Sequence, residues 1–383
     1  MKNLVRTIAL LLLVTISFSG CASDRQQLKD KAIVQGMGID YRDDKQESGY
    51  EITLQVFDVS KSEGSGQSIK GTITTTYSSK GETIFSAIEN GQKVLDRNTF
   101  MAQNKLLVVG EKVAQSDMAE VLDYYTRVAD CRPDVQIAVA RGSAKGVIES
   151  TCKQSMIPAV KIANTLINGE FNGKSVNIFV FEAINAYKSQ TSDMYLPLVK
   201  TFGSGKDNNV ALDGIAVFQG RKMVGTLDTA ETHGLLFINH KISNGNIIIN
   251  HESLGKITMK ITASSSSKKV RIKDGKVYFD VKIKCALNVY EIENGLTDVV
   301  VDTDVESFEK SASKKIEKEM RKALKKCLKE YKSDVFDIGK LVAMKDHDFY
   351  DQNKDHWEDL LDQIEFSVHA DCKVKKIDGE EKK

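Results

Sequence analysis

The residue with the clearest chemical potential is Cys21, at the boundary between an apolar segment and a polar one. The apolar block, residues 8–18, follows the positive charges of Lys2 and Arg6 and precedes a small Ser-Gly pair at 19–20. It is shorter than the roughly 20 apolar residues that span a bilayer. This layout is typical of a secretory signal peptide, which is removed after small residues. A thiol just behind the cut would be available for alkylation.

The order Ser-Gly-Cys resembles the lipobox of bacterial lipoproteins. There the thiol receives diacylglycerol, the chain is cut between Gly20 and Cys21, and the new amino terminus is acylated. Two acyl chains give stable membrane anchoring where one would be marginal. We therefore expect residues 1–20 to be a lipoprotein signal peptide and Cys21 to carry S-diacylglycerol and an N-acyl group. Ordinary cleavage near Ala22, leaving a secreted soluble protein, is the alternative.

Other motifs that could do chemistry are incomplete. Gly36 and Gly38 lack the third glycine and following helix of a dinucleotide site, so they are expected to allow a bend or a close backbone approach. The six histidines form no HExxH zinc motif. Residues 351–362 superficially resemble a calcium loop, but His356 stands where glycine is needed. The sequence also lacks GxSxG and phosphate-loop motifs. It predicts no enzyme, no metal and no cofactor.

Amino-acid composition and net charge exclude further classes of protein. Hydrophobic content of 41% and charged content of 28% are ordinary for a globular protein. The whole chain carries +1, and without residues 1–20, which hold two positive charges and no acid, it carries −1. This neutrality argues against nucleic acid as a partner. Apolar runs beyond residue 20 reach only four or five residues. The chain is expected to be tethered to a membrane, not to span it.

Periodicity indicates the elements that position these residues. Expected strands are 32–40, 51–59, 105–110, 135–141, a hairpin over 213–227 turning near Gly220, 246–250, 255–263, 277–292 and 365–374. Expected helices are 81–95 with Phe85 on its apolar face, 116–128 capped by Ser116, 143–151, 158–168, about 231–239, and a long one over 306–332. Residues 60–80 and 264–269 are expected to be loops, the first with an edge strand, and 201–209 a linker. Irregular alternation with several hairpins favours an α+β fold with mixed sheets.

Five cysteines remain besides Cys21, an odd number without a CxxC motif. Cys285 and Cys372 both fall on the apolar parity of their strands. Two buried thiols are therefore the expected state, and a single bridge between them is the alternative.

The long helix is rich in positive charge: residues 310–332 carry ten Lys or Arg against three Glu. A solvated face over a sheet is the ordinary interpretation. The alternative is contact with anionic lipid headgroups through Lys314, Lys318, Arg321, Lys325 and Lys329.

Several segments in order resemble the Ger(x)C family of spore germination lipoproteins, the C subunits of spore germinant receptors. They are Gly20-Cys21, AIVQGMGID, YEITLQV, GETIFSAI, NKLLVVGEKVA, LDYYTR…RPDVQIAVARGSAKGVIES, DGIAVFQGRKMVGTL, ETHGLLF and DVFDIGKLV…W…EFSVHADCKV. This chain departs from many relatives in having Ala-Ser after the Gly-Cys pair, where they have Trp-Asp.

The resemblance implies three domains, each a mixed or mostly antiparallel β-sheet with packed helices. We place them at 21–200, 201–263 and 264–376, with a charged tail at 377–383. It also implies anchoring on the outer face of the spore's inner membrane and two integral-membrane partners, a transporter-like B subunit and an A subunit. The subunit would do no chemistry, and no nutrient-binding residue is assigned. A lipid-anchored solute-binding protein of a transporter is the alternative function.

Overall fold

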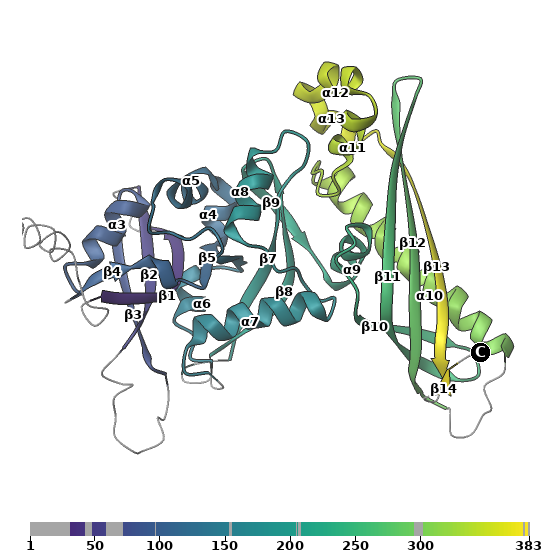
Figure 1. The fold of residues 1–383 in the computed structure, drawn as a ribbon, viewed down its shortest axis with the longest axis horizontal. Coiled ribbons are helices and arrows are strands. Elements are labelled where there is room, and N and C mark those ends of the chain that lie inside the picture. The colour runs from purple at the N-terminus through teal and green to yellow at the C-terminus, as the bar shows by residue number, and fades with distance from the viewer. Residues whose placement is uncertain are drawn as a thin grey trace, which may run out of the picture.

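The structure is a computed structural model that describes residues 31–42, 48–58, 72–95, 97–152, 155–203, 205, 208–294, 302–377 and 380–381. The expected signal peptide and Cys21 lie outside these residues, as do residues 60–71 of the expected 60–80 loop. The described chain forms two mixed β-sheets with packed helices, joined end to end (Figure 1). The α+β expectation with mixed sheets is confirmed.

The first sheet has nine strands in the order β3-β2-β1-β5-β6-β7-β8-β9, with β4 beside the start of β1. Its parallel centre consists of β1, β5, β6 and β7, and antiparallel hairpins extend it on both sides. The strands are β1 Lys31–Tyr41, β2 Tyr50–Phe57, β3 Thr74–Gly81, β4 Asn98–Phe100, β5 Leu106–Gly110, β6 Gln136–Ala140, β7 Tyr195–Phe202, β8 Asn209–Gln219 and β9 Lys222–Leu227.

Helices cover both faces of this sheet, which explains why its central strands are continuously apolar. They are α3 Ile84–Gly91, α4 Glu111–Ser116, α5 Ala119–Arg127, α6 Ala144–Ile148, α7 Pro158–Phe171 and α8 Val180–Lys188. Leu106 and Val108 of β5 belong to a small core under α6 and α7, whereas Leu107 and Val109 belong to the main core. A Cβ at Gly36 would lie 2.7 Å from Cβ of Ala159, so the expected close approach is confirmed.

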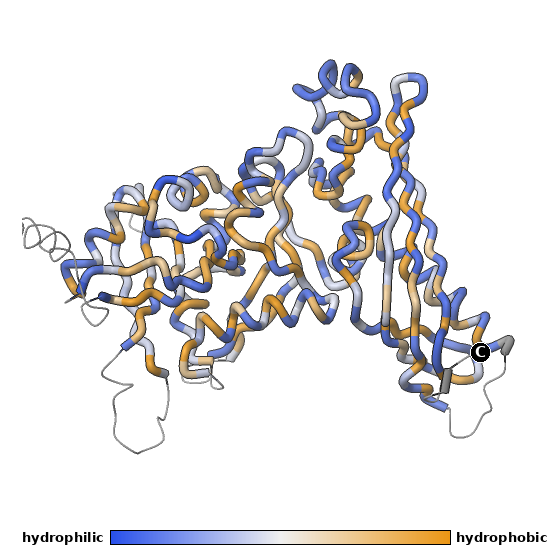
Figure 2. Tube along the Cα trace, viewed as in Figure 1, coloured by the Kyte–Doolittle hydropathy of each residue, from blue (hydrophilic) through white to orange (hydrophobic). Residues whose placement is uncertain are grey.

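The second sheet is built from long strands in the order β10-β11-β12-β13-β14. They are β10 Gly245–His251, β11 Gly255–Lys273, β12 Lys276–Ile292, β13 Glu365–Ile377 and the short β14 Glu380–Glu381. All neighbours are antiparallel except β12 and β13, which are parallel. Alternate side chains of β12 and β13 are buried beneath helix α10 (Asp302–Leu324), while the tip of the β11–β12 hairpin is hydrophilic (Figure 2).

A helical segment beside the second sheet is fixed to the first sheet by two carboxylates. It comprises α11 Ile338–Lys345, α12 His347–Asn353, η5 Lys354–His356 and α13 Trp357–Leu361. The Asp193 carboxylate accepts from the backbone N–H groups of Gly220 and Asp334, each at 2.8 Å. The Asp334 carboxylate accepts from the backbone of Gly339 at 2.6 Å and from Nε1 of Trp357 at 3.2 Å. Burial raises the pKa of Asp334 to about 6, and the nearby Asp193 charge adds to this.

Several local expectations are wrong. Ser116 ends α4 and caps nothing; instead, Asp117 Oδ1 accepts from Ala119 N at 2.7 Å at the start of α5. Phe85 is 55% exposed, since it lies on the outer side of α3. Residues 264–269 form part of β11, not a loop, because hydroxyls such as that of Ser266 donate to backbone carbonyls of the covering chain.

The expected linker at 201–209 is also wrong. It holds the end of β7 and the start of β8, which pair with each other as an antiparallel hairpin. The hairpin expected over 213–227 is confirmed, but it belongs to the first sheet, while β10 and β11 belong to the second. The described residues therefore form two sheets, not three, and the division into three domains stays a prediction.

Candidate functional site

Helix α10 forms because apolar residues recur every three or four positions and produce one buried stripe. The buried residues are Val305, Phe308, Ala312, Ile316, Met320, Ala323 and Leu324. The stripe continues through Cys327 and Leu328 in the π-helical segment η4 (Lys325–Glu330). It packs on the second sheet and on α9 (Thr229–Ile238), which leaves the lysine-rich side of α10 facing outward.

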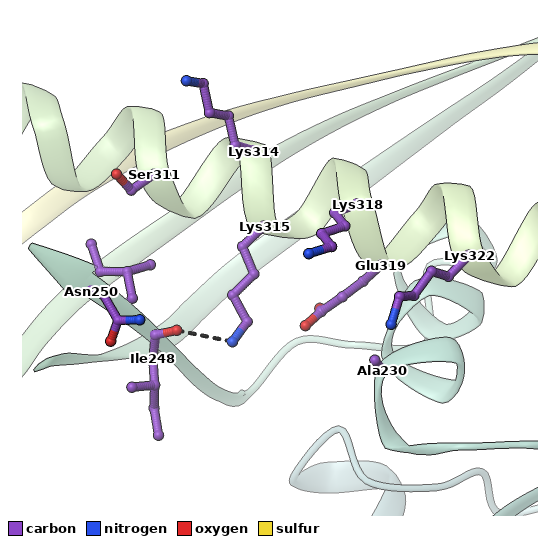
Figure 3. Close-up of a pocket in the computed structure, with 10 residues that line it drawn as sticks. Ala230, Ile248, Asn250, Ser311, Lys314, Lys315, Lys318, Glu319 and Lys322 are labelled. Atoms are coloured by element: carbon purple, nitrogen blue, oxygen red, sulfur yellow. Dashed lines mark hydrogen bonds between the residues drawn. The ribbon is translucent and has the colours of Figure 1, made fainter.

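A groove runs along α10 where it meets α9 and the edge strand β10 (Figure 3). Its volume is about 420 Å³. Four of its residues are lysines and only one is acidic. The residues that line it are Ala230, Ile248, Ile249, Asn250, Ser311, Lys314, Lys315, Lys318, Glu319 and Lys322. We call this feature the basic groove.

The charges of the basic groove are unbalanced. Glu319 is already engaged, because its Oε2 lies 3.2 Å from Nδ1 of His233. Lys315 Nζ donates to the backbone carbonyl of Ile248 at 2.9 Å, which holds this lysine against the edge of β10 (Figure 3). Lys314, Lys318 and Lys322 make no hydrogen bond or ion pair within the described part of the chain. An anion in the groove would therefore meet ammonium groups that need not give up another partner.

The five basic residues predicted to face a membrane do not share one role. Lys314 and Lys318 line the basic groove, and Lys325 is exposed farther along the helix. Arg321 Nη2 reaches across to the carbonyl of Val368 on β13, at 3.4 Å. Lys329 Nζ donates to the carbonyl of Ile364 at 3.0 Å and to that of Asp362. Its ammonium group therefore anchors the residues that lead into β13. Membrane contact stays a prediction for all five.

Sequence reasoning missed how α10 closes the outer edge of β13. Ala370 N donates to Glu317 Oε1 at 3.0 Å, Cys372 N to Ser313 Oγ at 3.1 Å, and Val374 N to Glu309 Oε1 at 2.9 Å. Unpaired edge groups invite pairing with another chain, and these side chains occupy them. A signal was present: Glu309, Ser313 and Glu317 recur every four residues beside the apolar stripe, as one polar line.

The charged side chains of the basic groove are suited to binding an anion. Over the described residues no group of three or more His, Cys, Asp or Glu could hold a metal ion. In the same part of the chain no helix is both long and apolar enough to cross a bilayer. The basic groove presents a cluster of ammonium groups beside a sheet edge, of which Lys315 is held by the carbonyl of Ile248, and such groups can bind phosphate or carboxylate.

Comparison with known proteins identifies the family. Residues 24–201 match the family model described as the spore germination protein N-terminal domain, and residues 213–378 match the one described as spore germination B3/GerAC like, C-terminal. This chain belongs to the GerAC-like family of spore germination proteins. The resemblance read from the sequence is confirmed, and its segments span both matched regions.

Relatives of this spore germination protein match most of its length. Spore germination protein B3 of Bacillus subtilis (strain 168) is 23% identical over 94% of this chain and 94% of its own. Spore germination protein KC of the same organism is 24% identical over 96% and 94%. A crystal structure of the GerBC protein superposes with a TM-score of 0.59 at 19% identity, covering 88% of this chain and 97% of that one. The last comparison supports the fold.

Proposed function

We propose that this chain is a non-enzymatic, lipid-anchored subunit of a spore germinant receptor, required for nutrient-triggered germination. The observation that carries the proposal is the match of two spore germination models over 24–201 and 213–378, directly behind a lipobox-like Gly20-Cys21. In this proposal Cys21 bears the lipid on the extracytoplasmic face of the spore's inner membrane. The partners are integral-membrane subunits, a transporter-like B subunit and an A subunit.

The role we propose is binding and assembly. Two acyl chains confine the protein to the membrane surface and raise its effective concentration near its partners without any new contact. β1, which follows the tether, and α10 lie at opposite ends of the molecule (Figure 1). If both the lipid and the basic groove contact one bilayer, the long axis of the protein lies along the membrane.

We further propose that the basic groove contacts anionic headgroups. Each basic residue near an anionic surface contributes about 1 kcal/mol, so Lys314, Lys318 and Lys322 together are worth roughly 3 kcal/mol at low salt. The test is flotation of the unlipidated protein with vesicles of phosphatidylglycerol and phosphatidylcholine. The triple Lys→Gln variant should bind roughly 100-fold more weakly. A matched variant with the exposed Lys269, Lys273 and Lys276 of the β11–β12 hairpin changed to Gln should bind like wild type, and equal loss in both would refute the groove as the contact.

The membrane-anchor proposal is tested by Cys21→Ala. We expect wild type to fractionate with membranes and its Cys21 peptide to carry a diacylglycerol mass, while Cys21→Ala is found in the soluble fraction and fails to support nutrient-triggered germination. An unmodified Cys21 thiol in the native protein would overturn the proposal. Thermal-shift screening with amino acids addresses the alternative: a solute-binding protein would be stabilised by its ligand through mass action.

A further inference from the structure

Two cysteines of the second sheet lie directly opposite each other. Cys285 on β12 and Cys372 on β13 are partners in the parallel register of these strands. Neighbouring strands are about 4.8 Å apart, and disulfide-bonded residues have Cα atoms roughly 4.4–6.8 Å apart. The backbone of this sheet therefore places the two cysteines within bridging distance.

Their side chains also point the same way. Cys285 is 3% exposed and Cys372 is 1% exposed, both on the face covered by α10. The two thiols are close enough to shift each other's pKa, and the backbone N–H of Cys372 donates to Ser313 Oγ on α10 at 3.1 Å. The helix thus holds one strand of the pair in place from above.

The neighbouring Cys372 and burial raise the pKa of the Cys285 thiol. Thiolate is the attacking species in thiol–disulfide exchange, and a thiol buried under α10 is out of reach of glutathione. The exchange therefore takes place while the chain folds, before α10 covers the two cysteines.

We propose that Cys285 and Cys372 form a disulfide bond as the protein folds in the presence of a small disulfide oxidant such as oxidised glutathione. Both are free thiols in the structure. The thiolate of one of the two cysteines attacks oxidised glutathione, which breaks its S–S bond, forms a mixed disulfide and releases one glutathione thiolate. The other cysteine then attacks the sulfur of the first and releases the second glutathione thiolate. The two protons lost by the cysteines go to the two glutathione thiolates, and glutathione takes up both electrons.

The bond would fix β13 to β12 covalently. These two strands are separated in sequence by α10 to α13, so the bridge closes a long loop and restricts the unfolded chain. On its other edge, over most of its described length, β13 meets side chains of α10 instead of another long strand. The extracytoplasmic location favoured under the proposed function would supply an oxidising environment, but the bond chemistry does not depend on that location.

The decisive experiment maps the bond directly. The full-length chain carrying Cys21→Ala, which leaves five cysteines, is unfolded in urea, refolded in reduced and oxidised glutathione, quenched in acid, alkylated under denaturing conditions without reductant and digested. Mass spectrometry should find one peptide pair linked through Cys285 and Cys372, with Cys131, Cys152 and Cys327 alkylated. Alkylation of all five thiols, or bridges of mixed pairing, would overturn the proposal.

Variants give a second readout. Reductant should lower the Tm of oxidised wild type by about 5 °C or more, and that of Cys131→Ala by the same amount. The Cys285→Ala/Cys372→Ala double variant should show no reductant-dependent shift, and an unchanged shift there would refute the bond. Neither readout involves Cys21 or membranes, so failure here and failure of lipid anchoring are separate results.

Discussion

The contact between α9 and α10, which builds one wall of the basic groove, can be tested with a single methyl group. Gly234 lies on α9 where the two helices meet, and a Cβ there would be 2.2 Å from the carbonyl oxygen of Glu319 and 2.6 Å from its carbonyl carbon. Both atoms are backbone, so no side chain can rotate away. Gly234→Ala therefore forces α9 to move away from α10 by about 1 Å to reach ordinary contact.

The expected magnitude follows from two opposing effects. Alanine favours a helix over glycine by about 1 kcal/mol. Overpacking against fixed atoms costs roughly 1–3 kcal/mol, and the backbone clash places Gly234→Ala at the upper end, about 3 kcal/mol. The net loss should be about 2 kcal/mol. Gly146→Ala in α6 is the matched control, because its nearest neighbour atom, Cγ2 of Thr201, lies 4.0 Å away. It should gain up to about 1 kcal/mol.

Urea unfolding followed by circular dichroism and by fluorescence of Trp357, the single tryptophan, measures both variants. The two free energies of unfolding should differ by about 3 kcal/mol in favour of Gly146→Ala. The unfolded chain changes equally in both, so the difference reports the helix contact. If the two variants unfold alike, the close packing of α9 on α10 is refuted.

Three further predictions concern stability. Asp334 has a folded pKa of about 6 against an ordinary 3.8, so its contribution to stability should be largest below pH 4 and fall by about 3 kcal/mol as pH rises to 6. In pH-dependent unfolding, the free energy of wild type minus that of Asp334→Asn should show this fall, and a difference that rises with pH would refute the assignment. Glu309→Ala should lower the free energy of unfolding in urea by roughly 1–3 kcal/mol, because it leaves the N–H of Val374 on β13 unpaired. The control Glu306→Ala, at an exposed position, should lower it by less than about 0.5 kcal/mol, and equal losses would contradict the edge contact. Tyr331→Phe should lose about 1–2 kcal/mol by thermal unfolding, because its hydroxyl bonds both the N–H and the carbonyl of Thr226, and an unchanged Tm would count against this link.

The short-range spacing of apolar residues was sufficient to predict β12 and α10 and the face that each of them buries. Strand β12 follows its alternation from Val277 to Val289 with every second residue buried, and α10 follows its apolar stripe. The composition of a segment gave a wrong prediction where its polar residues make long-range contacts. The Ser-rich stretch at 264–269 has the composition of a loop, yet its hydroxyls and Lys268 bond to carbonyls of distant segments, so it remains a strand. Helix α8 was not expected, although Glu182 caps it through the backbone N–H of Phe179.

The sequence predicted only part of the basic groove. The lysine content of α10 is plain in the sequence, but which ammonium groups are committed is not. Lys329 and Arg321 are held by carbonyls of the chain around β13, and Lys315 by the carbonyl of Ile248 on β10. These residues have hydrogen-bond partners, and Lys314 and Lys318 have none among the described residues, because of how β10 and β13 lie against α10.

The sequence by itself determined the family, the mixed α+β character and the cysteine behind an apolar segment, because these depend on residue order and short-range periodicity. Tertiary structure alone decided that β8 and β9 extend the first sheet, that Cys285 lies opposite Cys372, and that α10 contacts both β10 and β13 of the second sheet. Those outcomes depend on which strands become neighbours. Neighbours are selected by burying apolar faces and satisfying backbone groups across the whole chain, and no local window contains that information.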